Sequence, residues 1–210
     1  MSHREIAIDT YRRYRTGLSI NIAVAILQLI TLALFANSLT LLGDTMHGIA
    51  DILILLGTTI LAKKASMYAH EHHGMRKRIL ALIAVLLLWV SAGYIVHESI
   101  IRISTPTAFP GWVVIVVALF AAVGNFFAHR VISAVDDTEK DSLHEANVAH
   151  LLTDCALSCV VVISGLGVLV FGLPSIDAWF ALCIVAPFMT LWGGRILFNK
   201  TEHAHHGHHH

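Results

Sequence analysis

Six long apolar stretches alternate with short polar segments along the chain. A membrane-spanning helix needs about 20 mostly apolar residues to cross a hydrocarbon core about 30 Å thick. Each apolar stretch is about that long, and Asn, His, Pro, Gly or acidic residues mark the breaks between them. We therefore predict an all-α fold, a six-helix transmembrane bundle. The spans are expected at about 18–36, 39–62, 79–102, 111–134, 145–172 and 175–198.

The composition supports a membrane protein. Of the 210 residues, 56% are hydrophobic and 13% are charged, about half the charged share of an ordinary soluble domain. The formal net charge is zero, and nothing in it indicates a nucleic-acid partner. We expect a multi-pass integral protein of a bacterial-type inner (plasma) membrane, surrounded by the lipid bilayer. Its predicted parts are an N-terminal segment at 1–16, a six-span domain at 17–200 and a His-rich tail at 201–210.

The Lys and Arg residues predict how the bundle is oriented. Cytoplasmic ends of membrane helices carry an excess of these residues. With six spans, both termini and the connections after the second and fourth spans share one side, and 13 of the 14 Lys and Arg residues fall there. Arg102 alone falls on the other side. The N- and C-termini are therefore expected in the cytoplasm.

Several ionisable residues lie inside the predicted spans. Such side chains are costly in a membrane, so each one is a candidate functional residue. The second span carries Asp44, His47 and Asp51, and the fifth carries His150 and Asp154. Offsets of three, four and seven residues fall on one face of a helix, so each set forms a stripe. The stripe of the fifth span also includes Asn147 and Ser158.

The two stripes are complementary if their helices face each other. The second and fifth spans run in opposite directions, and a step of four residues rises about 6 Å along a helix. His47 is then level with Asp154, and Asp51 is level with His150. An isolated His in a span is as well explained by packing as by a ligand role. Two such motifs on facing helices favour a binding site near the middle of the membrane.

Two nitrogen and two oxygen donors suit the tetrahedral coordination of Zn²⁺. Mg²⁺ and Ca²⁺ prefer six or more oxygens, and copper(I) prefers sulfur. Cd²⁺, Co²⁺, Fe²⁺ and Mn²⁺ stay open as alternatives. Two carboxylates neutralise a divalent ion inside the bilayer, and an emptied site should take up protons because imidazole titrates near neutrality. Competition between metal and protons for one site predicts an antiporter.

The same residues resemble the cation diffusion facilitator family over the whole membrane portion. The segment Asn-Ser-Leu-Thr-Leu-Leu-Gly-Asp-Thr-Met-His-Gly-Ile-Ala-Asp at 37–51 is similar to the family's second-span signature. His-Leu-Leu-Thr-Asp at 150–154, with Ser158 nearby, is similar to its fifth-span signature. Glu-Ser-Ile-Ile-Arg at 98–102 resembles the end of its third span, and Asn125 matches an Asn of its fourth span.

The resemblance implies a homodimeric zinc transporter that exports Zn²⁺ from the cytoplasm in exchange for protons by alternating access. The quartet His47, Asp51, His150 and Asp154 resembles the ligand set of the family's zinc-selective branch. Family members usually carry a soluble C-terminal metal-binding domain, for which this sequence shows no counterpart after the sixth span. Dimerisation is therefore expected through transmembrane helices.

For the polar residues of the spans outside the quartet, we consider two roles. Asp44 is expected at the outer mouth of the pathway or in a hydrogen bond to a neighbouring helix. Asn21, Gln28, Asn125 and His129 are expected mainly in interhelical hydrogen bonds, with support of the ligands as the alternative. The same supporting role is the hypothesis for Asn147 and Ser158.

Two His-rich segments lie outside the predicted spans. The connection after the second span is a candidate secondary metal site, or else a solvated loop, through His70, Glu71, His72 and His73. The tail at 201–210 is either a native collector of zinc or a purification tag.

Two other classes of function stay open. A membrane-embedded zinc hydrolase would hold its metal with three protein ligands and leave a position for water. Because four ligands converge in the predicted site, we expect that the protein is not an enzyme. A membrane metal sensor or store would bind metal without moving it across the membrane.

Overall fold

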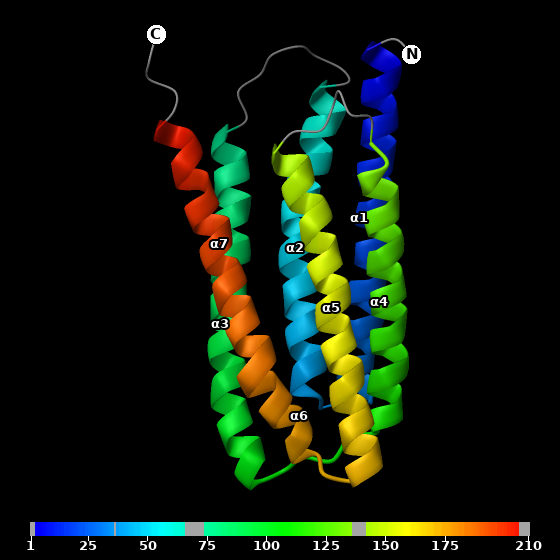
Figure 1. The fold of residues 1–210 in the computed structure, drawn as a ribbon, viewed down its shortest axis with the longest axis vertical. Coiled ribbons are helices and arrows are strands. Elements are labelled where there is room, and N and C mark those ends of the chain that lie inside the picture. The colour runs from blue at the N-terminus through cyan, green and yellow to red at the C-terminus, as the bar shows by residue number, and fades with distance from the viewer. Residues whose placement is uncertain (1–2, 36, 66–73, 136–141, 206–210) are drawn as a thin grey trace.

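The computed structural model describes residues 3–35, 37–65, 74–135 and 142–205. Every regular element among these residues is helical, and the helices run up and down one long axis (Figure 1). Six helical stretches are long and apolar enough to span a membrane, which confirms the predicted fold class. The elements are α1 (His3–Leu34), α2 (Leu39–Ala65), α3 (Gly74–Ser104), α4 (Gly111–Ser133), α5 (Ser142–Phe171), α6 (Ser175–Phe180), the π-helical turn η2 (Ala181–Val185) and α7 (Ala186–His205).

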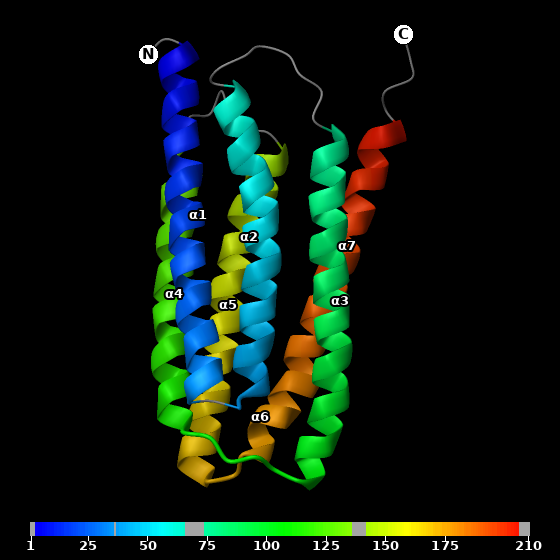
Figure 2. The same cartoon turned by 180° about the vertical axis from the view of Figure 1, so that it is seen from behind.

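The helices form two groups that meet along α2 (Figure 1, Figure 2). The first group is α1, α2, α4 and α5, in which α4 and α5 share the most extensive contact. The second group is α3 and α7, which lie side by side, and α3 also packs against α2. α1 begins and α7 ends at the same end of the bundle, as an even number of spans requires. α2 and α5 are therefore antiparallel neighbours.

The first helix extends well beyond its predicted span. α1 begins at His3, whereas its apolar stretch begins near residue 18. Tyr14 is buried in one apolar cluster with Ala128 of α4 and Leu151 of α5. The apolar pattern marks only the length that lies in hydrocarbon, while packing against α4 keeps the polar extension helical. Helix and apolar stretch therefore start at different residues.

The sixth span contains a π-helical turn that the apolar pattern does not predict. α6, η2 and α7 follow one another without leaving the helical conformation. Val185 at the end of η2 is buried against Gly43 of α2, where an added Cβ would overlap it. The missing side chain at Gly43 thus lets η2 approach α2 closely. A π turn contains one residue more than an α turn, so it changes which face of α7 is directed at α2 and α5.

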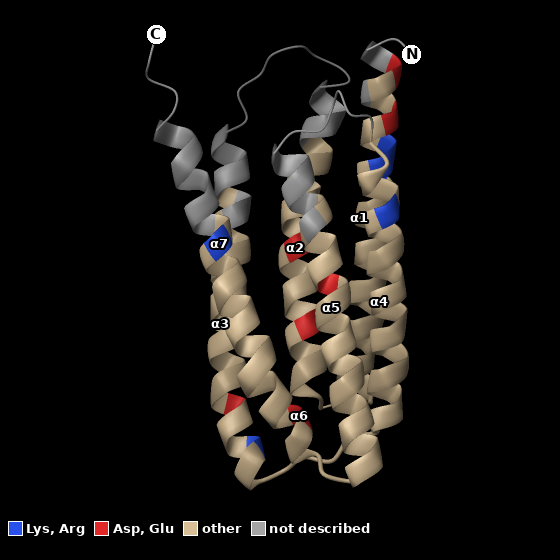
Figure 3. Cartoon of the chain, viewed as in Figure 1, with Lys and Arg blue, Asp and Glu red and all other residues tan. Residues whose placement is uncertain are grey.

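The charged residues divide between the ends and the middle of the bundle. Most of the described Arg positions lie toward the end where α1 begins, and acidic positions occur midway along α2 and α5 (Figure 3). Arg102 lies in the last turn of α3, pairs with Glu98 at 2.8 Å and donates a hydrogen bond to the Asn37 backbone carbonyl. This bond ties α3 to the connection between α1 and α2. Which end faces the cytoplasm stays a prediction.

Asp177, near the start of α6, joins three helices at the end opposite the termini. Its buried carboxyl group accepts hydrogen bonds from Ser38 Oγ at 2.9 Å, from the Leu39 backbone N–H at 2.5 Å and from Ser164 Oγ at 2.9 Å. Thr40 Oγ1 donates to it as well. The first N–H groups of a helix have no partner within that helix, so Asp177 caps α2 from outside. Through Ser164 it also holds α5.

We expect Asp177→Ala to destabilise the bundle. The change leaves several buried donors without an acceptor, and a hydrogen bond to a charged group contributes about 1.5–3 kcal/mol. A loss of roughly 3 kcal/mol in the free energy of unfolding should appear as a lower Tm in detergent. Asp9→Ala is the control, because its pair with Arg13 is partly exposed and such pairs contribute about 0.3–0.5 kcal/mol. An unchanged Tm for Asp177→Ala would contradict the capping role.

Candidate metal centre

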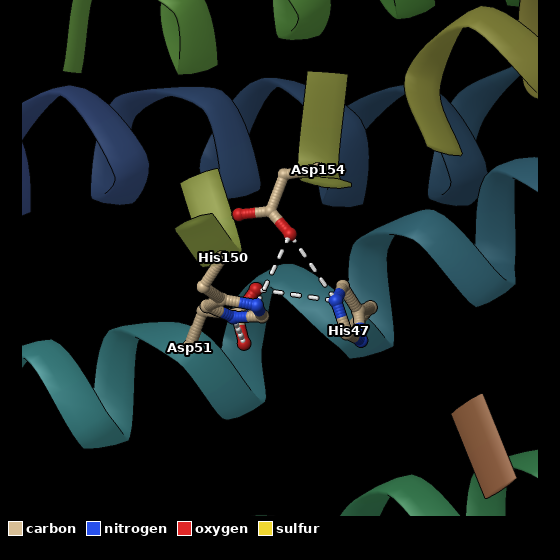
Figure 4. A group of neighbouring side chains, drawn as sticks. All are labelled: His47, Asp51, His150 and Asp154. Carbon is tan, nitrogen blue, oxygen red and sulfur yellow. Dashed lines mark ion pairs between the residues drawn. The ribbon is translucent and has the colours of Figure 1, made fainter. Parts of the chain in front are cut away.

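Four ionisable side chains from α2 and α5 meet inside the bundle. His47 and Asp51 lie one turn apart on α2, and His150 and Asp154 lie one turn apart on α5. All four are buried, with exposed fractions between 1% and 7%. Figure 4 shows them pointing toward one another from the two helices. The structure therefore brings together the four residues that the helix geometry places level with one another.

Each imidazole lies near carboxylates of both helices. His47 Nε2 is 3.2 Å from Asp154 Oδ1 and 3.6 Å from Asp51 Oδ2. His150 Nε2 contacts Asp51 Oδ1, and its Nδ1 is 3.8 Å from Asp154 Oδ1. The closest contacts join His47 with Asp154 and His150 with Asp51, as expected for antiparallel helices.

Beyond their contacts with one another, the four side chains offer ligand atoms that no other group pairs with. One ligand atom from each residue lies within 4.8 Å of the others. The ring nitrogens of both His, both oxygens of Asp51 and Oδ1 of Asp154 have no hydrogen-bond partner of good geometry within the described structure. Buried polar atoms normally have such partners, so this concentration marks a place for a ligand. A tetrahedral Zn²⁺ with bonds of about 2.1 Å separates its ligand atoms by about 3.4 Å, close to the distances found.

A small cavity lies beside the quartet, between α1, α2, α4 and α5. Its volume is about 20 Å³, which is enough for one water molecule or ion. Small and polar side chains from α1 and α4 complete its walls, so the quartet faces polar groups on this side. The lining residues are Asn21, Val24, Ala25, Gln28, Asp44, His47, Gly48, Asp51, Asn125 and Asp154.

Asp44 is a fifth buried ionisable residue, one turn before His47 on α2. Gln28 of α1 donates a hydrogen bond to its Oδ2 at 2.6 Å, and Ser158 of α5 donates at 3.2 Å. The structure thus shows the second of the two places considered for Asp44, a hydrogen bond to neighbouring helices. Because Asp44 also lines the cavity beside His47, it adds a third carboxyl group to the surroundings of the quartet.

Of the other polar residues singled out in the spans, two contact a neighbouring helix and two line the cavity. Gln28 makes the interhelical hydrogen bond expected of it, and His129 Nδ1 on α4 lies 3.1 Å from the Val148 backbone carbonyl on α5. Asn21 and Asn125 are buried and line the cavity, and Asn21 Oδ1 has no hydrogen-bond partner there. These two Asn residues therefore lie beside the quartet, and their support of its ligands stays a prediction.

Some candidate residues fall outside the described part of the chain. The side chain of Asn147 is among them, as is the His-rich cluster His70, Glu71, His72 and His73 in the connection after α2. The last residues of the His-rich tail, 206–210, belong to the same group. Their predicted roles stay predictions.

Sequence reasoning missed two aromatic residues of α7 that contact the quartet. Trp192 stacks on His150, with ring centroids 4.5 Å apart and planes 11° apart. Phe188 meets His47 edge-on, with centroids 5.2 Å apart. Their spacing of four residues puts them on one helix face. Many apolar pairs of the sixth span share that spacing, so it does not indicate which pair faces the quartet. Only the packing of α7 selects this face.

The fold and the cluster define a polytopic membrane protein with a buried His/Asp cluster, of the residue types that ligate metals, shared by two antiparallel spans. Comparison with known families matches residues 15–199 to the cation efflux transmembrane domain. The chain belongs to the cation efflux family, the cation diffusion facilitators, and its quartet fits the zinc-site branch of that family. It is therefore a membrane cation transporter. A comparison with curated proteins finds no match.

We expect the purified protein to bind Co²⁺ with the intense visible absorption of tetrahedral cobalt, because four protein donors converge at one point. The double variant His47→Ala/His150→Ala should lose these bands, since two of the four ligands are gone. Titration followed by visible spectroscopy measures the effect. The double variant also gives the background from the other His residues of the chain. Bands of full intensity in it would show that cobalt binds elsewhere.

Proposed function

We propose that the protein exports Zn²⁺ from the cytoplasm in exchange for protons, by exposing the quartet alternately to the two sides of the membrane. The observation that carries this proposal is the convergence of two imidazoles and two carboxylates inside the spans of a cation efflux protein. Transporters of several folds bind their substrates near the middle of the bilayer, at the junction of moving parts. The metal ion is the transported substrate.

The donor set favours zinc among the divalent metals. Imidazole nitrogen and carboxylate oxygen in a tetrahedral arrangement are typical of Zn²⁺ sites. Cd²⁺ and Co²⁺ accept the same donors, whereas Fe²⁺ and Mn²⁺ commonly gather more ligands. The two carboxylates, Asp51 and Asp154, cancel the two charges of the ion and lower the cost of holding it in a low dielectric. We therefore propose Zn²⁺ as the main substrate, with Cd²⁺, Co²⁺, Fe²⁺ and Mn²⁺ as weaker ones.

Exchange for protons follows from the same charges. When the metal leaves, Asp51, Asp154 and nearby Asp44 remain as three carboxyl groups in a buried volume that contains no Lys or Arg among the residues lining it. Metal ligands bind only when deprotonated, so metal and protons compete for the imidazoles and carboxylates. Protons that bind the emptied site neutralise its carboxylates. The protein can then return to the cytoplasm-facing state without burying unpaired charges. This competition supports antiport.

The direction of transport and the assembly rest on other observations. The excess of Lys and Arg in the terminal segments and in the connections after the second and fourth spans supports a cytoplasmic location for that end, and hence export of zinc. The resemblance to the cation diffusion facilitators supports a homodimer formed through transmembrane helices, and we propose a bacterial-type inner membrane as its location.

Polar residues near the quartet have supporting roles in this proposal. Asp44 and Asn125 line the cavity beside the quartet, and Ser158 holds Asp44 by a hydrogen bond. We propose that these three, with Asn147, line the metal's pathway or steady its ligands. The His-rich connection at 70–73 is proposed as a secondary metal site that supplies the pathway.

An enzymatic function is the weaker alternative. Cation efflux proteins are transporters, and a catalytic zinc keeps one position open for water, whereas four protein ligands converge here. Metal binding without flux would instead indicate a sensor or store. Both alternatives are separated from transport by one measurement of metal movement across a membrane.

The test is zinc uptake into proteoliposomes whose interior is more acidic than the outside. We expect uptake that collapses with the pH gradient, and we expect Asp51→Ala and Asp154→Ala each to abolish it. Glu98→Ala is the control, because it removes a carboxylate on α3 that pairs with Arg102. Parallel assays with Cd²⁺, Co²⁺, Fe²⁺ and Mn²⁺ give the metal preference. Wild-type rates in both Asp variants would show that the site is wrongly assigned.

Deletion of residues 202–210 addresses the His-rich tail. The quartet lies on α2 and α5, so transport by the truncated chain should keep most of its maximal rate and at most show a weaker apparent affinity for zinc. Rates measured over a range of zinc concentrations separate the two quantities. A complete loss of flux in folded, membrane-inserted protein would contradict the accessory role of the tail.

A further inference from the structure

Two aromatic rings of α7 cover one side of the His/Asp quartet. The Trp192 indole lies flat on the His150 imidazole, with centroids 4.5 Å apart. The Phe188 ring meets the His47 imidazole edge-on at 5.2 Å and stacks with Trp192 at 6.1 Å. We call Phe188 and Trp192 the aromatic wall. Both imidazoles of the quartet therefore rest against rings that offer no lone pair to a metal ion.

The other side of the quartet differs in chemistry. The cavity of about 20 Å³ there is lined by Asp44, Asn21 and Asn125, all of which carry side-chain oxygens. An ion that prefers six or more ligands needs further protein oxygens or several waters around it. The aromatic wall supplies neither on the side of α7, and the cavity has room for about one water. The surroundings therefore limit how many ligands a bound ion can gather.

We propose that Trp192, with Phe188 beside it, determines the metal specificity of the quartet as a positioning residue. Trp192 holds the His150 ring so that Nε2 is directed at Asp51, and the aromatic wall keeps water away from the α7 side of the metal. Ions that accept four ligands, such as Zn²⁺ and Co²⁺, are selected over ions that require six, such as Mn²⁺ and Mg²⁺. The inference rests on the proposed function, because it assumes that the metal binds at the quartet.

The indole of Trp192 has a feature that packing alone does not explain. Its Nε1 is buried without a hydrogen-bond partner in the described structure, and an unpaired buried N–H destabilises a fold. A purely space-filling role would be met better by an apolar side chain such as Phe or Leu. The Arg195 guanidinium also lies over the indole, 5.5 Å from the ring centroid. The unpaired N–H therefore favours a role for the flat ring that stacks on His150.

α7 also contacts α3, through Trp89. The indole N–H of Trp89 donates to the Thr190 backbone carbonyl at 3.3 Å, and its ring lies against Gly193, where a side chain would overlap it. Trp89 is thus a second Trp at the α3–α7 contact. Its indole N–H donates to a backbone carbonyl of α7, whereas the Trp192 ring stacks on His150 of the quartet. It provides a matched control for Trp192.

Substitutions of Trp192 separate ring stacking from the filling of space. Trp192→Phe keeps a flat ring, Trp192→Leu keeps an apolar side chain without one, and Trp192→Ala removes both. For the Leu and Ala variants we expect the ratio of Zn²⁺ to Mn²⁺ affinity to fall roughly tenfold or more, since partners that orient ligating His residues change metal affinity about 10–100-fold. Their tetrahedral Co²⁺ bands should weaken toward those of six-coordinate cobalt. Trp192→Phe should keep most of the wild-type ratio.

Trp89→Ala should keep both the affinity ratio and the cobalt spectrum, because it leaves the aromatic wall in place. Wild-type ratios and spectra in Trp192→Leu would overturn the inference, and so would an equal change in Trp89→Ala, which would indicate general loosening of α7. The Leu variant keeps the test decisive if Trp192→Ala does not fold. Absence of tetrahedral cobalt and of zinc flux in the wild-type protein would instead overturn the proposed function, and the inference with it.

Discussion

Carboxyl groups that lie close together in the low dielectric of a membrane protein need positive charge beside them. In this bundle Asp51 and Asp154 approach each other from α2 and α5, and two imidazoles are the nearest groups able to carry or admit such charge. A divalent ion satisfies both carboxylates at once, and protons on the imidazoles or carboxylates do so in its absence. The proposed exchange of metal for protons rests on the cost of leaving these charges bare.

The fold keeps this arrangement together from one end. Asp177 gathers the start of α2, the far part of α5 and the start of α6 through hydrogen bonds to a single carboxyl group. α7 packs mainly on α3, so the quartet lies between the group of α1, α2, α4 and α5 and the pair of α3 and α7. Alternating access requires relative movement of such groups around a fixed site.

The two sides of the quartet also differ in what they offer a metal ion. Toward α1 and α4 there are amide and carboxyl groups around a small cavity, with Asn21 Oδ1 unpaired. Toward α7 there are the flat faces and edges of Trp192 and Phe188. A polar side allows an ion or water to be exchanged, and an aromatic side confines it. The same four ligands can thus be selective because of the groups behind them, as in other metal sites.

The amino-acid sequence is enough to predict the six spans, the stripes on the second and fifth of them, and the level at which His47 meets Asp154. These depend on the length of a helix that crosses hydrocarbon and on its 3.6-residue period, both of which are local properties of the backbone. The hydrogen bonds from Gln28 and Ser158 to Asp44, and the stacking of Trp192 on His150, are seen only in the packed bundle. Those contacts depend on the rotation of each helix about its axis, which spans that are apolar on nearly every face leave unspecified. In the sixth span the π turn at Ala181–Val185 adds to that rotation, so the face bearing Trp192 became known only once α7 was packed.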